Sequence, residues 1–271
     1  MAVPRLSLAH LTVLDAHPLD LIDAAVAGGF DAIGLRIVPP MRTDTIVPVI
    51  GDETLIRRFE QGLSDTGIEV LDVEAIWLGP DSDVAALEPA LALGRRLGAS
   101  NVLVVGNDPD AVRVTDNFAA LAELAGRYQL KLGLEFIPYC HTSTLQQAHS
   151  VVKVSRQPNA GVLVDALHLI RSGGSASDLR KIEPTTILYG QICDARAERP
   201  QTQEALRHEA RGGRLYPGQG HLPLREILDA LPRGLPLGVE APCAEYGHLP
   251  VAERARICGA ATRRFLESRG P

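Results

Sequence analysis

Aromatic residues are scarce in this chain of 271 residues, where Phe, Trp and Tyr together make up 4% and Trp occurs once. Proteins that hold long carbohydrate chains use aromatic side chains as stacking platforms. The shortage therefore disfavours a polymeric ligand and favours a small-molecule substrate. The remaining composition, with 45% hydrophobic and 22% charged residues, is that of a folded globular protein with a sizeable core.

Long apolar runs and clusters of basic residues are also missing. The apolar runs are short and broken by Gly, Pro or charge, so we expect no membrane association. The N-terminus, M-A-V-P-R-L-S-L-A-H, lacks the cationic and apolar regions of a secretory signal, which favours a cytoplasmic location. A formal net charge of −6, with no basic stretch interleaved with aromatics, argues against a nucleic-acid partner. Homo-oligomer formation stays open.

Paired cysteines are absent as well. Cys140, Cys193, Cys243 and Cys258 are widely spaced and form no C-x-x-C motif. This spacing suits neither a disulfide framework nor a zinc ribbon, so we expect the four thiols to be buried as small hydrophobic groups.

What is present is a regular alternation of short β-branched apolar runs with longer segments of helical spacing. The runs that we interpret as strands are R-L-S-L-A-H from Arg5, A-I-G-L-R-I-V from Ala32, E-V-L-D-V-E-A-I-W-L from Glu69, N-V-L-V-V-G from Asn101, K-L-G-L-E-F-I from Lys131, G-V-L-V-D from Gly161, I-L-Y-G-Q-I-C-D from Ile187 and L-P-L-G-V-E from Leu235. Glycines such as Gly67 and Gly98 stand just before the next strand, as expected at helix C-termini.

Eight strands in this length predict one (β/α)₈ TIM barrel that forms a single domain over residues 1–271. The alternative is a doubly wound open sheet, but no G-x-G-x-x-G follows the first strand. One long irregular stretch is predicted, from Ala195 to about Pro223. Loops of that length in a compact domain are usually functional.

Oxygen-bearing side chains end four consecutive strands in the second half of the chain. They are Glu135, Asp165, Gln191 and Glu240. In a TIM barrel the carboxyl ends of the strands meet on one face, so these oxygens would converge. An all-oxygen set favours Mn²⁺ or Mg²⁺, with Co²⁺ and Zn²⁺ as alternatives. A second reading, in which each acid pairs with an Arg or caps a helix, stays open.

These positions resemble the xylose isomerase-like TIM barrels, the superfamily of sugar phosphate isomerases and epimerases. The resemblance rests on Glu at strand five, Asp165-x-x-His168 at strand six, Gln191 with a following Asp at strand seven and Glu at strand eight. The stretch P-G-Q-G-H-L-P-L, 217–224, is similar to one common in bacterial members. The resemblance implies that Glu135, Asp165, Gln191 and Glu240 hold the metal and that His168 faces the substrate. It also implies that Glu135 and Glu240 exchange the substrate proton.

The resemblance implies a metal-dependent isomerase or epimerase of a small sugar or keto-polyol. Such enzymes abstract a proton beside a carbonyl while the metal holds the developing enediolate oxygen. The alternative is a dehydratase of a cyclic keto-polyol such as 3-dehydroshikimate or an inosose, because the same enolate can expel a β-hydroxyl. Two departures weigh against an epimerase: Gln191 stands where the epimerases have His, and I-P-Y-C-H replaces their second glutamate after strand five.

Two further readings rank lower. A nucleic-acid repair enzyme like the endonuclease IV branch would need histidine-rich zinc ligands and a basic surface. A binding module with a decayed metal site is disfavoured because all four ligand positions keep an oxygen donor.

Several other side chains near the strand ends are candidates for substrate binding. They are Arg36, Glu74, Trp77, Asp194, Arg196 and Arg214. Arg suits bidentate recognition of anions, although a solvated or structural role is the alternative for each of the six. His10, after the first strand, is another candidate for the barrel mouth, and a structural role is its alternative.

Overall fold

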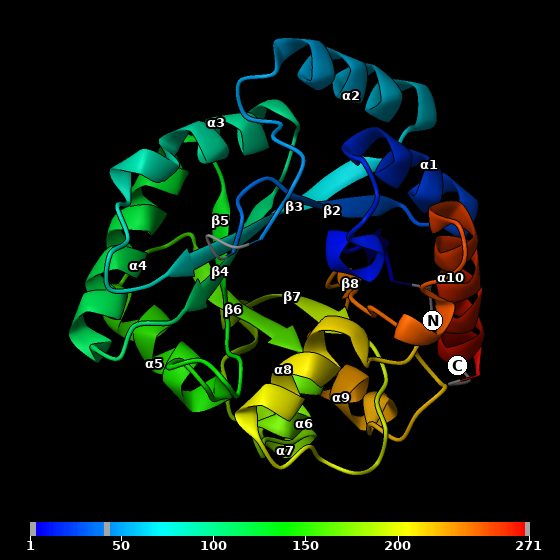
Figure 1. Ribbon diagram of the computed structural model, residues 1–271. Helices are drawn as coiled ribbons and strands as arrows, with labels where there is room; N and C mark the ends of the chain where they lie inside the picture. Colours follow the sequence, from blue (N-terminus) through cyan, green and yellow to red (C-terminus); the bar gives the residue numbers. More distant parts are fainter. Residues whose placement is uncertain (1–3, 41–43, 269–271) are drawn as a thin grey trace.

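The computed structural model describes residues 4–40 and 44–268, in which eight parallel strands close into a barrel ringed by helices (Figure 1). The strands are β1 (Leu6–Leu8), β2 (Ala32–Arg36), β3 (Glu69–Leu78), β4 (Asn101–Gly106), β5 (Lys131–Glu135), β6 (Ala160–Asp165), β7 (Ile187–Ile192) and β8 (Leu237–Val239). Each strand pairs with its neighbours in chain order, and β8 returns to pair with β1. The predicted TIM barrel is confirmed, and every predicted run overlaps one strand.

The helices follow the strands as the sequence pattern predicts. The α-helices are α1 (Pro18–Gly28), α2 (Glu53–Thr66), α3 (Glu88–Arg96), α4 (Ala111–Arg127), α5 (Leu145–Ser155), α6 (Ala166–Arg171), α7 (Ala176–Leu179), α8 (Gln203–Gly212), α9 (Leu224–Ala230) and α10 (Val251–Glu267). Short 3₁₀ turns are η1 (His10–Val13), η2 (Ala85–Leu87), η3 (Pro184–Thr186) and η4 (Ala244–Tyr246). Gly67 and Gly98 adopt positive φ angles of 73° and 79° at their predicted helix ends.

Alternate residues of the strands pack into two separate hydrophobic clusters, one between the strands and the helices and one inside the barrel. On β4, Val102 and Val104 pack outward with the helices, whereas Leu103 and Val105 pack with Tyr189 inside the barrel. The four cysteines are buried and unbridged, as expected. No helix among the described residues is long and apolar enough to cross a bilayer.

The stretch 195–223, predicted to be irregular, contains helix α8, so that prediction is wrong for residues 203–212. The helix escaped the sequence pattern because its sequence, Q-E-A-L-R-H-E-A-R-G, is mostly polar and buries only Leu206, Glu209 and Ala210. Thr202 caps its N-terminus by accepting a hydrogen bond from the backbone N–H of Ala205 at 3.1 Å. In Figure 1, α8 lies in front of the carboxyl end of the barrel, near α6 and α9.

Helix α1 follows the first strand of the barrel and α10 follows the last, and the two helices lie side by side (Figure 1). The two helices are tightly packed at Gly28 and Gly259, because a Cβ on Gly259 would stand 2.1 Å from the carbonyl oxygen of Gly28. Only a residue without a side chain fits this contact, because the obstructing atom belongs to the backbone.

We predict that Gly259→Ala lowers the free energy of unfolding by about 1–3 kcal/mol, because the added methyl group forces α1 and α10 apart. Urea denaturation measures the change. The matched control is Gly212→Ala in α8, where nothing lies within 4 Å of the added Cβ. An unchanged urea midpoint for Gly259→Ala would contradict the tight packing of this helix pair.

Candidate metal centre

Three carboxylates converge at the carboxyl end of the barrel. Glu135 ends β5, Asp165 ends β6 and Glu240 directly follows β8. One carboxylate oxygen from each lies within 4.8 Å of the others, and none of the three residues is more than 4% exposed. The structure thus brings together the three acids that the sequence analysis selected, and it does so because parallel strands in a closed barrel end at one level.

Gln191 on β7 is paired in register with Asp165, so the two side chains lie on the same face of the barrel wall. Its amide oxygen Oε1 is buried and accepts no hydrogen bond from any described residue, and the same holds for Oε1 of Glu135. Buried acceptors without a donor are costly unless a cation or an ordered water satisfies them. The three carboxylates, with an amide oxygen on the strand next to Asp165, are oxygen donors of the kind that suits a divalent cation.

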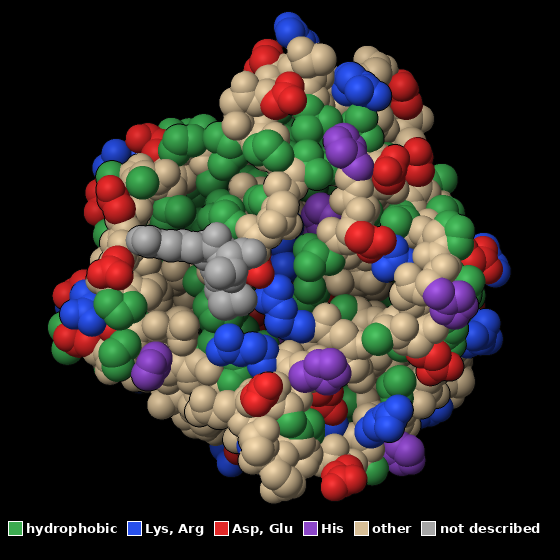
Figure 2. Space-filling view, viewed as in Figure 1, with side chains coloured by type: hydrophobic (Ala, Val, Ile, Leu, Met, Phe, Trp, Pro, Cys, Tyr) green, Lys and Arg blue, Asp and Glu red, His purple; other side chains and the backbone are tan. Residues whose placement is uncertain are grey.

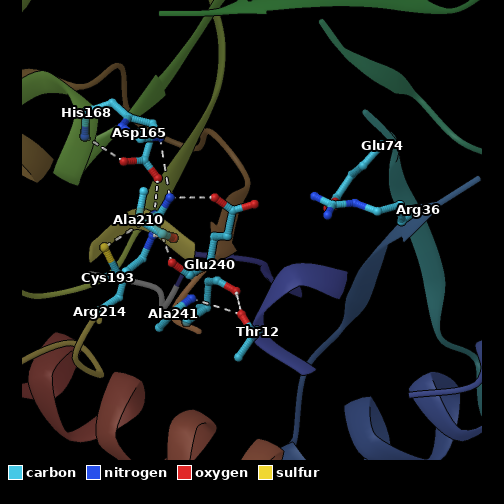
Figure 3. Close-up of polar contacts among 11 residues, drawn as sticks. Thr12, Arg36, Glu74, Asp165, His168, Cys193, Ala210, Arg214, Glu240 and Ala241 are labelled. Carbon is cyan, nitrogen blue, oxygen red and sulfur yellow. Dashed lines mark hydrogen bonds and ion pairs between the residues drawn. The ribbon is translucent and has the colours of Figure 1, made fainter. Parts of the chain in front are cut away.

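Arg214 lies among these acids and is itself only 1% exposed. Nη1 donates to Asp165 Oδ2 at 2.6 Å and Nη2 donates to Glu240 Oε2 at 2.9 Å, as drawn in Figure 3. Nε is occupied by the carbonyl oxygen of Ala210 at 2.9 Å. The alternative reading, in which the acids pair with Arg, thus holds for Asp165 and Glu240. Arg214 thus forms ion pairs with two of the three carboxylates, and Glu135 has no ion-pair partner among the described residues.

Burial and mutual repulsion dominate the protonation of the cluster. Burial, reinforced by Glu240 and Asp165, raises the pKa of Glu135 well above its usual range. Burial also raises the pKa of Glu240, although Arg214 opposes the shift. Asp165 is the exception: burial acts upward, but Arg214 and His168 bring its pKa below the usual value. A bound cation would replace the protons that Glu135 and Glu240 otherwise favour.

His168 is positioned by Asp165 itself. Asp165 caps helix α6, and its Oδ1 accepts the backbone N–H of His168 at 2.8 Å. Burial lowers the pKa of His168 to about 4, so the imidazole is neutral at pH 7. Arg214 Nη2 lies 3.4 Å from Nε2, which makes Nε2 the acceptor and assigns the proton to Nδ1. Nδ1 has no hydrogen-bond partner among residues 4–40 and 44–268.

A small cavity of about 40 Å³ opens above this cluster. Its polar lining includes Arg36, Glu135, His168, Arg214 and Glu240. A much wider groove of about 1160 Å³ lies between α8 and the segment 243–245, and the two spaces share only Arg211 and Arg214 among their lining residues. Figure 2 shows Lys and Arg side chains gathered near the centre of the same face. The acids are therefore enclosed within the barrel, and arginines surround the entrance.

The family model described as "Xylose isomerase-like TIM barrel" matches residues 22–260. The chain belongs to this family. A curated relative, "3-dehydroshikimate dehydratase" of Pseudomonas aeruginosa, is 27% identical over 222 residues, which cover 76% of this chain and 33% of the relative. The chain thus spans about a third of the length of that relative.

Solved structures of xylose isomerase-like barrels share the fold along the whole chain. The IOLI protein, solved with a zinc atom, superposes with a TM-score of 0.80 at 21% identity and covers 98% of this chain and 99% of its own. The probable 3-DHS dehydratase AsbF from Bacillus anthracis superposes with a TM-score of 0.75 at 14% sequence identity. The superposition covers 96% of this chain and 98% of the AsbF chain. D-allulose 3-epimerase from Methylomonas sp. superposes with a TM-score of 0.69 at 16% sequence identity. The superposition covers 100% of this chain and 99% of the epimerase chain.

The remaining substrate-binding candidates separate into two groups within this xylose isomerase-like barrel. Arg36 and Trp77 line the small cavity, and Glu74 lies behind Arg36, 3.6 Å from its Nη2. Asp194 and Arg196 do not line it. Asp194 Oδ1 instead accepts the backbone N–H of Ala195 and of Leu222, both at 2.9 Å, and so holds the P-G-Q-G-H-L-P-L loop in place.

Arg196 and His10 have contacts of other kinds. Arg196 lines the wide groove, and its carbonyl oxygen accepts from Arg171 Nη2 at 2.7 Å. Both ring nitrogens of His10 are engaged: Nδ1 accepts the backbone N–H of Arg36 at 3.2 Å, and Nε2 lies 3.1 Å from the carbonyl oxygen of Ala16. These contacts give His10 a structural role.

Sequence reasoning missed Tyr139 and the ion pair between Arg171 and Glu209. Tyr139 lines the cavity and meets the His168 ring edge-on at 6.0 Å; its position four residues after Glu135 was the available signal. Arg171 Nε and Nη2 donate to the two carboxylate oxygens of Glu209 at 2.8 and 2.7 Å. This buried pair joins α6, which carries His168, to α8, and no local pattern in the sequence links residues 38 positions apart.

We predict that Arg171→Met destabilises the protein by about 3–5 kcal/mol, because it leaves the buried Glu209 carboxylate without a partner. Thermal unfolding followed by circular dichroism measures the loss. Arg256→Met is the control, since the Arg256–Glu253 pair is on the surface, and its melting temperature should not change. Equal melting temperatures for the two variants would contradict a structural role for the Arg171–Glu209 pair.

Proposed function

We propose that this protein is a divalent-metal-dependent dehydratase of a small cyclic keto-polyol. The observation that carries the proposal is the unequal state of the two glutamates. Glu240 is held by Arg214 at 2.9 Å, whereas Oε1 of Glu135 is buried without a donor. Exchange of a proton on both faces of a substrate needs two available bases, and elimination on one face needs a single one. The arrangement supports elimination.

Glu135 is the proposed base. Its Oε1 is buried and has no hydrogen-bond donor among the described residues, so this oxygen is available to accept a proton. It takes the proton from the carbon beside the carbonyl, and as a carboxylic acid it returns that proton to the β-hydroxyl, which leaves as water. The carbon–hydrogen and carbon–oxygen bonds break, a carbon–carbon double bond forms and Glu135 is regenerated.

His168 and the ligand set support this step. The unpartnered Nδ1–H of His168 can donate a hydrogen bond to a substrate oxygen without transferring the proton, since the imidazole is neutral. The metal, held by Glu135, Asp165, Gln191 and Glu240, would supply the Lewis acid that stabilises negative charge on the carbonyl oxygen. The oxygen donors favour Mn²⁺ or Mg²⁺. The curated relative, a 3-dehydroshikimate dehydratase, supports 3-dehydroshikimate as the first substrate to test.

An isomerase or epimerase is the second candidate. It is favoured by the positions of Glu135 and Glu240, which approach the site from β5 and from the end of β8 and so could reach two faces of one substrate. In that case the enolate is reprotonated and no water leaves.

We predict about one equivalent of a divalent metal in the purified protein, measured by mass spectrometry. Gln191→Ala and Glu240→Gln should each weaken metal affinity at least tenfold, because loss of a ligand costs no less than the roughly 10–100-fold known for outer-sphere partners. Glu245→Gln, an exposed carboxylate at the edge of the wide groove, is the control and should keep the metal. A wild-type protein that stays metal-free after reconstitution with Mn²⁺ or Mg²⁺ would exclude the proposed centre.

We predict that the metal-loaded protein converts 3-dehydroshikimate into an ultraviolet-absorbing product, and that His168→Asn lowers kcat about 100-fold while the metal content is unchanged. The reaction is run in D₂O and followed by absorbance and by proton NMR. Growth of absorbance supports the dehydratase. Deuterium uptake beside the carbonyl of an inosose or a ketohexose, with no new absorbance, would instead establish the isomerase or epimerase.

A further inference from the structure

Arg36 is a buried cation at the end of β2, in the half of the barrel that faces the acid cluster from the other side. It is 6% exposed and lines the small cavity together with Glu135, His168 and Glu240. Figure 3 shows its guanidinium across the cavity from Arg214, on the side of Glu74. Arg36 therefore faces any molecule bound at the proposed metal centre.

The guanidinium of Arg36 lacks the partners that a buried arginine normally has. Among the described residues it donates no hydrogen bond, and Nε is buried without a partner. Its ion pair with Glu74 spans 3.6 Å, which is too long for a hydrogen bond. The other two described arginines of the cavity are already engaged: Arg214 by Asp165 and Glu240, and Arg211 by Asp44 at 3.1 Å.

Glu74 forms an ion pair with Arg36 but no hydrogen bond to it. Within the described part of the chain neither carboxylate oxygen of Glu74 has a hydrogen-bond partner, and the residue is 1% exposed. Burial, with Asp72 as the next cause, raises the pKa of Glu74 well above its usual range, which weakens its ion pair with Arg36. The guanidinium of Arg36 therefore keeps donors that an anion in the cavity could use.

The barrel is shaped to keep these groups in place. A Cβ on Gly34 would stand 2.2 Å from Glu74 Oε1 and 2.7 Å from Asp72 Oδ1, so the glycine leaves room for both acids. Asp72 is in turn fixed by the hydroxyl of Tyr189, which donates to it at 2.7 Å across the barrel. Glu74 is therefore held beside Arg36 and limits the directions in which the guanidinium can turn.

We propose that Arg36 binds a carboxylate of the substrate, so that this site takes a hydroxylated keto acid rather than a neutral keto-polyol. The inference rests on the proposed function for the reacting end of the molecule. A guanidinium with free donors matches the two oxygens of a planar carboxylate, and its fork of N–H groups suits bidentate recognition of that group.

The test compares an acid with its neutral ester. Shikimate and methyl shikimate share the hydroxylated ring, and neither carries a ketone, so calorimetry on the metal-loaded protein measures binding without turnover. We expect wild type to bind shikimate at least about tenfold more tightly than the ester, as for a charge-assisted bidentate contact. Arg36→Gln should bind both equally. Arg211→Gln, which removes the same charge from a guanidinium already paired with Asp44, should keep the preference.

The inference is wrong if wild type binds neither probe or binds both equally. It is also wrong if the preference for the acid survives Arg36→Gln, or if Arg211→Gln removes that preference as well. Circular dichroism confirms that each variant is folded. If the preference depends on Arg36 but 3-dehydroshikimate is not converted, the carboxylate site stands and the proposed elimination fails. If 3-dehydroshikimate is converted and Arg36→Gln leaves the KM for 3-dehydroshikimate unchanged, the proposed elimination stands and the carboxylate site fails.

Discussion

Three carboxylates share one buried space at the barrel mouth, and every other feature of the site follows from the need to compensate their charge. Glu135, Asp165 and Glu240 have lost the water that would screen them. Arg214 supplies one positive charge and uses Nε, Nη1 and Nη2 to hold Asp165, Glu240 and the end of α8 together. Oε1 of Glu135 and Oε1 of Gln191 have no donor among the described residues, and oxygens of this kind are the ligands that a divalent ion would satisfy.

The two halves of the barrel contribute groups of opposite charge to the candidate site. Strands β5 to β8 supply the oxygen cluster, and β2 and β3 supply Arg36 and the acids behind it. A substrate placed between them would meet negative charge and metal on one side and an arginine on the other. Such opposed charges fix the orientation of a polar ring as well as its position, and orientation decides which carbon lies next to the base.

Most of the fold could be predicted from the sequence because the strands are short, apolar and β-branched, and helical segments separate them. The convergence of Glu135, Asp165 and Glu240 could also be predicted, because each stands at the end of an apolar run and parallel strands end on one face. Contacts between distant residues could not. Arg214 meets Asp165 across 49 positions, and Arg171 meets Glu209 across 38, with no local pattern to announce either pair.

Helix α8 shows why the missed part matters for function. It buries few apolar side chains, so its position depends on polar contacts: Arg171 with Glu209, Arg211 with Asp44, and Arg214 Nε with the carbonyl oxygen of Ala210. The last of these ties the end of the helix to the guanidinium that balances the acid cluster. Arg214 therefore links α8, which lines the wide groove, to the acid cluster that lines the small cavity.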